Sequence, residues 1–429
     1  MNRREAAVLA ISLVAVPALG PAAEPFVLNP NGAWCWFQDE RALVFDKKLA
    51  AASITREGDV QVTSWDFRTG ASQVQTLRNN FGRDDHNVAA LLLRRDGRLM
   101  AFYAMHGNEA MMHYRVSARP RDPNAWETER SFDAGVADRF TYANPFQLRR
   151  EGGRIYLFWR GIGWNPTWSS TGDLGRTWRP GANHILFRKG ERPYVKYASD
   201  GDGTIHFAFT EAHPDAPVST SLYHAYYRNG ALHTSGGALV RKLADGPIAP
   251  SEATKVYDGA TSPTGEAWVW DLALDKSKRP VIAYTSRLDP MDHRYRYARW
   301  NGKNWEDHPI AYAGKRLYER ERFYSGGICL DPDDTSVIYL SSDVDIQTGK
   351  PNTSGHWEIY RGVTADGGEH WTWQPLTSNS QRDNLRPIVP AGHPRGTFVL
   401  WLRGVYRAYT DYEEEVVAYT DNRGVRLPK

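Results

Sequence analysis

The sequence predicts an all-β protein: a seven-bladed β-propeller whose blades are four-stranded antiparallel sheets. Three observations lead to this prediction. A hairpin pattern recurs seven times, its recurrences are spaced by roughly 50 to 75 residues, and the composition is rich in aromatic residues, with 16 Trp and 22 Tyr. A propeller blade needs room for four short strands, and aromatic rings pack well between sheets.

Each repeat contains a strand, a turn rich in Gly or Asp, and a strongly apolar second strand that ends at a charged or polar residue. The predicted strands are, in chain order, 36–45, 86–93 with 99–106, 142–148 with 155–160, 194–198 with 205–211, 268–274 with 280–287, 324–330 with 337–343, and 385–389 with 397–403. Every repeat leaves space for two more strands. Seven strand starts therefore predict seven blades.

Two repeats contain the pattern Thr-x-Asp-x-Gly-x-(Thr/His)-Trp, at 171–178 and 364–371. The Asp can accept hydrogen bonds from turn amides, the Gly permits the tight turn, and the Trp packs between sheets. The pattern resembles the Asp-box of sialidase-type propellers. We therefore expect Asp173 and Asp366 to have a structural role, away from the active face.

The N-terminus is typical of an export signal. Met1 to Arg4 form a basic start, residues 6–19 are apolar, and small residues follow. We expect residues 1–23 to be a signal peptide, residues 24–429 to form one catalytic propeller domain, and the protein to be secreted or periplasmic. No later segment approaches the ~20 apolar residues of a membrane span, so no membrane partner is expected.

The net charge of +3, from 53 basic and 50 acidic residues, disfavours nucleic-acid binding through bulk charge. An anionic partner must instead be bound by a local cluster. We expect a monomer. Cys35 and Cys329 could pair in an oxidising compartment, or they could remain two buried thiols, because two cysteines do not make a disulfide framework.

In a propeller, the start of each first strand and the end of each second strand lie on the same face. These positions are mostly polar, aromatic or charged: Gln38, Asp39, Arg41, His86, His106, Tyr142, Asn144, Arg160, Arg192, Tyr194, Glu211, His213, Trp270, Asp271, Arg287, Tyr324, Asp343, Asn384, Arg386 and Arg403. The opposite hairpin ends carry generic turns such as 95–97 and 151–153. This asymmetry predicts which face is functional.

Four segments, 32–42, 84–87, 101–107 and 324–327, resemble the BNR-repeat propeller family that contains the ulvan lyases and the L-rhamnose-α-1,4-D-glucuronate lyases. The likeness spans nearly all of the expected mature chain. It implies a polysaccharide lyase that cleaves a rhamnose/uronic-acid linkage in an acidic polysaccharide by β-elimination. It also implies that the chemistry needs no cofactor, and that a structural Ca²⁺ lies near the channel.

The resemblance further implies an active site of two histidines about twenty residues apart, a tyrosine and an arginine. These map onto His86, His106, Tyr142 and Arg160, with Tyr194 and Arg192 as competing candidates for the last two. The residues expected to bind substrate are Asn87, Asn144, Arg192, Tyr194, His213, Arg287 and Arg386. The chain has no EF-hand loop, so a calcium site would have to be assembled from scattered oxygens.

These residue types suit β-elimination. The carbanion formed at C5 of a uronate is stabilised when its carboxylate is neutralised, and an arginine can do so with two parallel hydrogen bonds. We assign Arg160 and His106 to neutralisation, and we expect His86 and Tyr142 to share the base and acid roles. The sequence leaves open which of the two is the base.

Two other functions remain open. A glycoside hydrolase would need a pair of carboxylates, for which the candidates are Asp39, Glu211, Asp271 and Asp343. A sialidase-like enzyme would instead need three arginines, from Arg160, Arg287, Arg386 and Arg403. A non-catalytic propeller would only hold an anionic glycan. Ultraviolet absorbance by an unsaturated uronate product distinguishes elimination from the other two.

Overall fold

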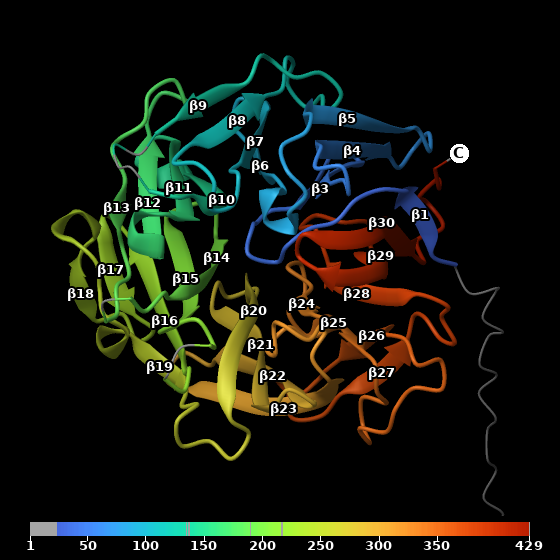
Figure 1. Cartoon of the computed structure of the whole chain (residues 1–429). Coiled ribbons are helices and arrows are strands. Elements are labelled where there is room, and N and C mark those ends of the chain that lie inside the picture. The colour runs from blue at the N-terminus through green and yellow to red at the C-terminus, as the bar shows by residue number, and fades with distance from the viewer. Residues whose placement is uncertain (1–23, 134, 136–137, 189, 216–217, 429) are drawn as a thin grey trace, which may run out of the picture.

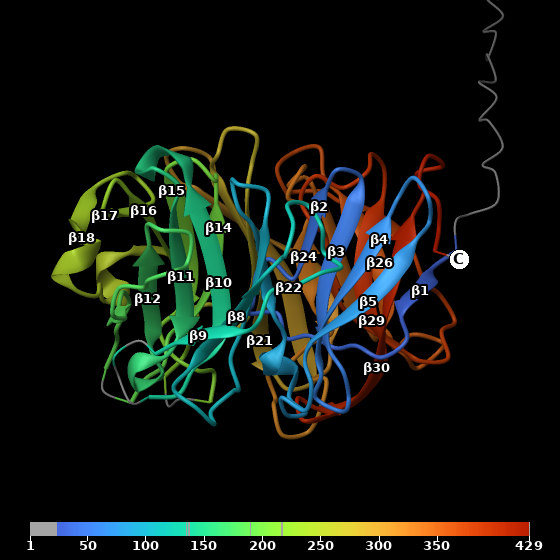
Figure 2. The same ribbon diagram turned by 90° about the horizontal axis from the view of Figure 1, so that it is seen from above.

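The computed structural model describes residues 24–133, 135, 138–188, 190–215 and 218–428. Seven antiparallel sheets stand around a common axis and form a ring (Figure 1), and their strands run across the thickness of the disc (Figure 2). The predicted seven-bladed β-propeller is confirmed. The predicted signal peptide, 1–23, lies outside the described residues.

The strands follow one another blade by blade. Blades 1 to 3 contain β2 (Ala42–Phe45), β3 (Lys48–Ile54), β4 (Val60–Asp66), β5 (Ser72–Arg78); β6 (Ala90–Leu93), β7 (Leu99–Tyr103), β8 (Met112–Val116), β9 (Arg130–Phe132); β10 (Thr141–Leu148), β11 (Arg154–Arg160), β12 (Pro166–Thr171) and β13 (Ala182–Asn183). Blades 4 and 5 contain β14 (Tyr194–Ser199), β15 (Thr204–Thr210), β16 (Leu222–Arg228), β17 (Ala231–Thr234), β18 (Leu239–Lys242), β19 (Thr254–Tyr257); β20 (Glu266–Leu274), β21 (Pro280–Asp289), β22 (Asp292–Trp300) and β23 (Trp305–Gly314). Blades 6 and 7 contain β24 (Ile328–Leu330), β25 (Val337–Ser342), β26 (Glu358–Val363), β27 (Thr372–Pro375); β28 (Asp383–Ile388), β29 (Phe398–Ala408), β30 (Asp411–Thr420) and β1 (Phe26–Asn29).

Short 3-10 turns join some of these strands. They are η1 (Asp85–Asn87), η2 (Arg149–Glu151), η3 (Ile162–Trp164), η4 (Leu243–Asp245) and η5 (Pro250–Glu252). Among the described residues no helix is long and apolar enough to cross a membrane.

Blade 7 closes the ring by joining the two ends of the chain. Its outer strand is the N-terminal β1, which pairs with β30 so that Phe26 lies opposite Ala418 and Val27 opposite Val417. Figure 1 shows the blue β1 beside the red β30. Because the first strand of the described chain completes the last blade, the two ends of the chain are hydrogen-bonded to each other and the ring is held closed.

Blade 4 departs from the predicted four strands. Its sheet has six, because β17 and β18 extend the outer edge and β19 returns to pair with β16. The repeat spacing is also longest here, since the first strands of blades 4 and 5 begin at Tyr194 and Glu266. The extra strands lie at the rim, so they leave the channel unchanged.

The inner strands are buried on both faces because each blade packs against its two neighbours. All five residues of β7 are buried, and so are the first four residues of β14. This continuous burial explains why these strands read as apolar runs and not as alternating patterns. It also holds the strand ends rigidly at the two faces of the disc.

Three inner strands begin later than predicted. The predicted starts were residues 36, 86 and 324, whereas the strands start at Ala42, Ala90 and Ile328. The intervening residues turn into the mouth of the channel as loops and, around His86, as η1. A regular strand would point successive side chains to opposite faces of its sheet, whereas the loops and η1 allow several polar side chains to converge at the channel mouth.

The two Asp-boxes have the structural role predicted for them. They lie between the third and fourth strands of blades 3 and 6. Asp173 Oδ1 accepts the backbone N–H groups of Arg176 and Thr177, both at 2.9 Å, and Asp366 Oδ1 accepts that of His370 at 3.0 Å. Cys35 and Cys329 are both buried and unbonded, as in the second alternative stated for them.

Candidate active site

A cleft of about 740 Å³ opens at the mouth of the channel. It is lined by all four residues expected in the active site and by three of those expected to bind substrate: His86, His106, Tyr142, Arg160, Arg192, Tyr194 and His213. They come from blades 2, 3 and 4, at the strand ends predicted to share one face. The convergence gives one compact polar site.

His86 lies on η1, just before the first strand of blade 2. Asp84 caps this turn: its Oδ1 accepts the backbone N–H of His86 at 2.9 Å and the ring Nδ1–H at 2.6 Å. The carboxylate therefore fixes both the backbone and the ring. With Nδ1 engaged, Nε2 is the nitrogen left for chemistry.

His106 shares the same carboxylate. Its Nδ1 lies 2.8 Å from Asp84 Oδ2, and its ring stacks on that of His86 with centroids 4.2 Å apart. Its backbone N–H donates to Asn87 Oδ1 at 2.7 Å. Asp84 thus holds two parallel imidazoles side by side.

The two rings differ in protonation. Burial alone would lower the pKa of His86, but the carboxylates of Asp84 and Asp85 raise it well above its usual value. The pKa of His106 is lowered, first by burial and then by the adjacent His86 cation, which together outweigh Asp84. One imidazole is therefore held as a cation and the other as a neutral ring.

Tyr142 faces the same point from blade 3. Its ring centroid lies 5.4 Å from that of His86. It sits at a register shift of β10 with a φ of 62°, a conformation that a bulky side chain rarely adopts. Burial, and then Tyr194, raise the pKa of Tyr142, so its phenol remains protonated and able to donate.

Arg160 ends β11 and forms the opposite side of the site. Its Nε donates to Trp164 O at 3.0 Å and one terminal nitrogen donates to Tyr194 Oη at 2.5 Å, while the guanidinium lies 4.3 Å from the Tyr194 ring centroid. The other terminal nitrogen is buried without a partner among the described residues. Such a nitrogen is suited to a substrate carboxylate.

Four residues expected to bind substrate do not line the cleft: Asn87, Asn144, Arg287 and Arg386. Each has protein partners. Asn87 donates to Phe81 O and Gly82 O, and Asn144 donates to Phe37 O and Tyr142 O. The amides therefore brace the backbone around the catalytic side chains, because buried polar groups must be hydrogen-bonded.

The two arginines were expected on the cleft because they lie at strand ends, but neither side chain lines it. Arg287 forms an ion pair with Glu266. Arg386 is 1% exposed and pairs with Asp85 beneath His86. A strand-end position therefore did not show whether the side chain turns into the mouth or below it.

The carboxylates considered for hydrolysis also lie elsewhere. Asp39 pairs with Arg41 and Lys196, Asp271 accepts the Leu330 N–H at 2.8 Å, Glu211 accepts that of Ser221 at 2.7 Å, and Asp343 lies 3.1 Å from Lys315 Nζ. None of these four lines the cleft. Arg403 likewise lies outside it, so neither the carboxylates nor the set of arginines predicted from the sequence for these alternatives is assembled there.

Several cleft residues were missed: Asp84, Trp164, Glu321 and Tyr409. Asp84 could have been found, because an acidic residue two positions before a buried histidine is a natural cap and ring partner. Tyr409, in the turn between β29 and β30, has its ring centroid 5.1 Å from that of His86. No repeat pattern predicts that a blade 7 turn reaches over blade 2.

The expected structural calcium site is not located by the acidic side chains and stays a prediction. Among the described residues five groups of His, Cys, Asp and Glu side chains could hold a metal ion, and every one of them includes a histidine. Calcium takes six to eight oxygen ligands, which include backbone and amide carbonyls as well as carboxylates. None of the five groups matches that preference.

Comparison with known proteins agrees with the fold. The sequence model of the BNR repeat-containing family matches residues 35–313. A curated relative, the ulvan lyase PL25 of Pseudoalteromonas sp. (strain PLSV), is 23% identical over 346 residues, which cover 71% of this chain and 65% of the relative. The chain thus spans less than two thirds of the length of the curated relative that it matches.

Two solved structures share the architecture. One is a PL25 ulvan lyase bound to -[GlcA(1-4)Rha3S]-, with a TM-score of 0.70 and 16% identity, covering 92% of this chain and 95% of the other. The other is a PL25 ulvan lyase with a TM-score of 0.68 and 17% identity, covering 93% and 94%. At this identity the likeness establishes the propeller fold.

Proposed function

We propose that this chain, which belongs to the BNR repeat-containing family, is a polysaccharide lyase that cleaves a rhamnose/uronic-acid linkage by β-elimination. The observation that carries the proposal is the stacked His86–His106 pair on Asp84, facing Arg160 and Tyr142 in one cleft. The ulvan lyase relative supports it. The substrate class is an acidic polysaccharide of the ulvan or rhamnose-glucuronate gum type, and the protein acts outside the cytoplasm.

In this mechanism Arg160 and His106 receive the uronate carboxylate. Arg160 offers the terminal nitrogen that has no protein partner. A bound carboxylate would raise the pKa of His106 and draw a proton onto its second nitrogen. Two cationic donors would then stabilise the negative charge that develops when the C5 proton leaves.

The pKa directions assign the two remaining roles. His86, backed by carboxylates, is the strongest base of the site once it has lost its own proton, so its Nε2 takes the proton from C5. Tyr142 keeps its phenolic proton and gives it to O4. The C4–O4 bond breaks and a C4–C5 double bond forms. His86 then releases the C5 proton to solvent, and a proton from solvent restores Tyr142.

Hydrolysis on the same face is the alternative with less support. The cleft carboxylates are Asp84, Glu191, Asp215 and Glu321. Asp84 is engaged by both imidazoles, and Asp215 lies 3.1 Å from Arg322 Nε. A hydrolase would therefore have to use Glu191 and Glu321 as its acid and its second carboxylate, and such a pair must lie on opposite sides of the bond.

The test is incubation of the full chain with ulvan and with gum arabic while following ultraviolet absorbance and reducing ends. We expect both signals to rise together on at least one substrate. Reducing ends without absorbance would mean hydrolysis, and binding without either signal would mean a glycan-binding propeller.

A further inference from the structure

A buried ion pair lies directly beneath the proposed site and the mechanism above does not use it. Asp85 Oδ2 is 2.6 Å from a terminal nitrogen of Arg386, and both side chains are 1% exposed. The pair joins β28 of blade 7 to the turn that precedes blade 2. Because the removal of two charges from water is unfavourable, the pair depends on its surroundings to persist.

Those surroundings hold Asp85 as a fixed anion. Its Oδ2 also accepts the Tyr406 hydroxyl at 2.8 Å, and the same Arg386 nitrogen donates to Trp34 O at 2.7 Å. The guanidinium lies 4.3 Å from the Tyr406 ring centroid. Despite complete burial, Arg386 and His86 lower the pKa of Asp85.

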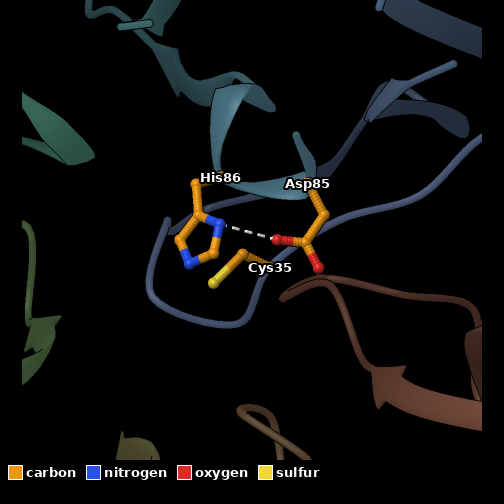
Figure 3. Close-up of side chains that lie close together, drawn as sticks. All are labelled: Cys35, Asp85 and His86. Carbon is orange, nitrogen blue, oxygen red and sulfur yellow. Dashed lines mark ion pairs between the residues drawn. The ribbon is translucent and has the colours of Figure 1, made fainter. Parts of the chain in front are cut away.

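The other oxygen of Asp85 is aimed at the catalytic ring. Asp85 Oδ1 lies 2.9 Å from His86 Nδ1, the contact drawn as a dashed line in Figure 3. Asp85 Oδ1 forms an ion pair with the His86 ring but no hydrogen bond, because the hydrogen on His86 Nδ1 points at Asp84. Figure 3 also shows the Cys35 sulfur beside the ring. Burial raises the pKa of that thiol, so it adds no charge.

We propose that Asp85 and Arg386 form a positioning pair that holds His86 and its proton from behind. This inference rests on the proposed function. Asp84 lies in the cleft, bridges both imidazoles and is exposed to substrate charge. Asp85 is sealed from solvent, so its field at His86 stays constant when an anionic sugar enters. Asp85 thereby preserves the basicity of His86 during turnover, and Arg386 holds the Asp85 carboxylate in place.

Other titratable groups also face His86. From the elements packed against its turn these are Cys35, His106, Tyr142, Glu321 and Tyr409. Tyr142 and Cys35 are neutral, and His106 is neutral at rest. The anionic charge behind Nδ1 therefore comes from Asp84 and Asp85, and removing Asp85 should lower the proton affinity of His86.

The test is an NMR pH titration of histidine-labelled protein, wild type against Asp85→Asn, with the pH dependence of lyase rate measured in parallel. We expect the His86 pKa to fall by about one to three units, the usual effect of losing a nearby opposite charge. The midpoint of the pH–rate curve should fall by the same amount. A His86 pKa equal to that of the wild type overturns the proposal.

Asp331→Asn is the matched control. His393 Nε2 lies 3.1 Å from Asp331 Oδ2 at the far end of the β24–β25 hairpin. That variant should lower the His393 pKa and leave His86 unchanged. The NMR titration judges the positioning pair even when the wild type gives no unsaturated product, so the two proposals fail separately.

A second variant covers the case in which Asp85→Asn does not fold. Arg386→Gln removes the cation while Asp85 remains between the His86 imidazolium and the Tyr406 hydroxyl. We expect the His86 pKa to rise. An unchanged or lower His86 pKa in folded Arg386→Gln overturns the proposal.

Discussion

Two stacked histidine pairs, one in blade 2 and one in blade 4, differ in protonation. The pKa of His86 is raised, whereas both pKa values of the blade 4 pair are lowered. The His86–His106 rings are 4.2 Å apart, and the His206–His224 rings are 5.3 Å apart. Both pairs are buried or nearly so. The blade 2 pair has a carboxylate between its Nδ1 atoms. In blade 4, His206 Nδ1 lies 3.0 Å from His224 Nε2, and neither ring is hydrogen-bonded to a carboxylate of the described residues.

The difference shows what sets the protonation state of a buried histidine. In blade 4, burial lowers the pKa of His206 to about 4 and that of His224 well below its usual value, so both stay neutral. In blade 2, the aspartates reverse the effect of burial on His86. The neighbouring carboxylates, and not the imidazole itself, decide whether a buried histidine holds a proton.

The largest expected effect comes from His86→Ala. Removing the general base should lower kcat/KM for lyase activity by about 10²- to 10⁴-fold. The initial rate of ultraviolet absorbance increase measures it, and circular dichroism checks that the propeller remains folded. Near-normal turnover in a folded variant would contradict the assignment.

His224→Phe is the counterpart in blade 4. It should leave kcat/KM unchanged but lower the unfolding free energy by about 1–3 kcal/mol, because His206 Nδ1 and Ser235 Oγ lose their partner. Thermal denaturation measures the loss. A large fall in kcat/KM at an unchanged melting temperature would mean that blade 4 takes part in the reaction.

Arg160→Ala is expected to lower kcat/KM by about 10²- to 10³-fold, because the uronate carboxylate loses its cationic hydrogen-bond donor. Arg160→Lys should recover only part of this, since an ammonium group cannot donate to a substrate carboxylate and also keep the guanidinium's hydrogen bonds to Trp164 O and Tyr194 Oη. Full activity in Arg160→Lys would show that a point charge suffices there.

The pH dependence of kcat/KM should reflect the raised pKa of the blade 2 pair and not the lowered pKa values of the blade 4 pair. The pKa of His86 is raised and the proposed base is its neutral form, so kcat/KM should rise with pH on the alkaline side of neutrality. A curve already flat at pH 6, near the ordinary histidine pKa of about 6.5, would contradict this role for His86.

The smallest effect is on acid stability. His206 stays neutral in the folded chain down to a pKa of about 4, whereas in the unfolded chain it binds a proton near its ordinary pKa of about 6.5. The unfolding free energy should therefore fall as the pH falls from about 6.5 towards about 4. In denaturant titrations His206→Phe should flatten this decline, and an unchanged slope would contradict it.

Much of the fold could be predicted because a propeller repeats one local pattern. The second strands of the repeats were located within a few residues, since buried apolar runs flanked by turns are strong signals. The closure by β1 and the extra strands of blade 4 were missed. Both depend on pairing between segments whose sequences carry no repeat signature.

The residue types of the site were predictable from the sequence, but which side chains reach the cleft and which are buried beneath it was less so. Positions at strand ends, together with the family resemblance, placed His86, His106, Tyr142 and Arg160 on one face, and they line one cleft. The same reasoning put Arg386 beside them, although it lies underneath as the partner of Asp85. Strand-end position specifies the face, but packing decides which side chain reaches solvent.

The most direct test of β-elimination is mass spectrometry of products formed in H₂¹⁸O. Elimination adds no water across the broken bond, so we expect unsaturated oligosaccharides, each lighter than its hydrolytic counterpart by one water and without ¹⁸O at the new reducing end before exchange. Saturated products that incorporate ¹⁸O at the moment of cleavage would contradict the account.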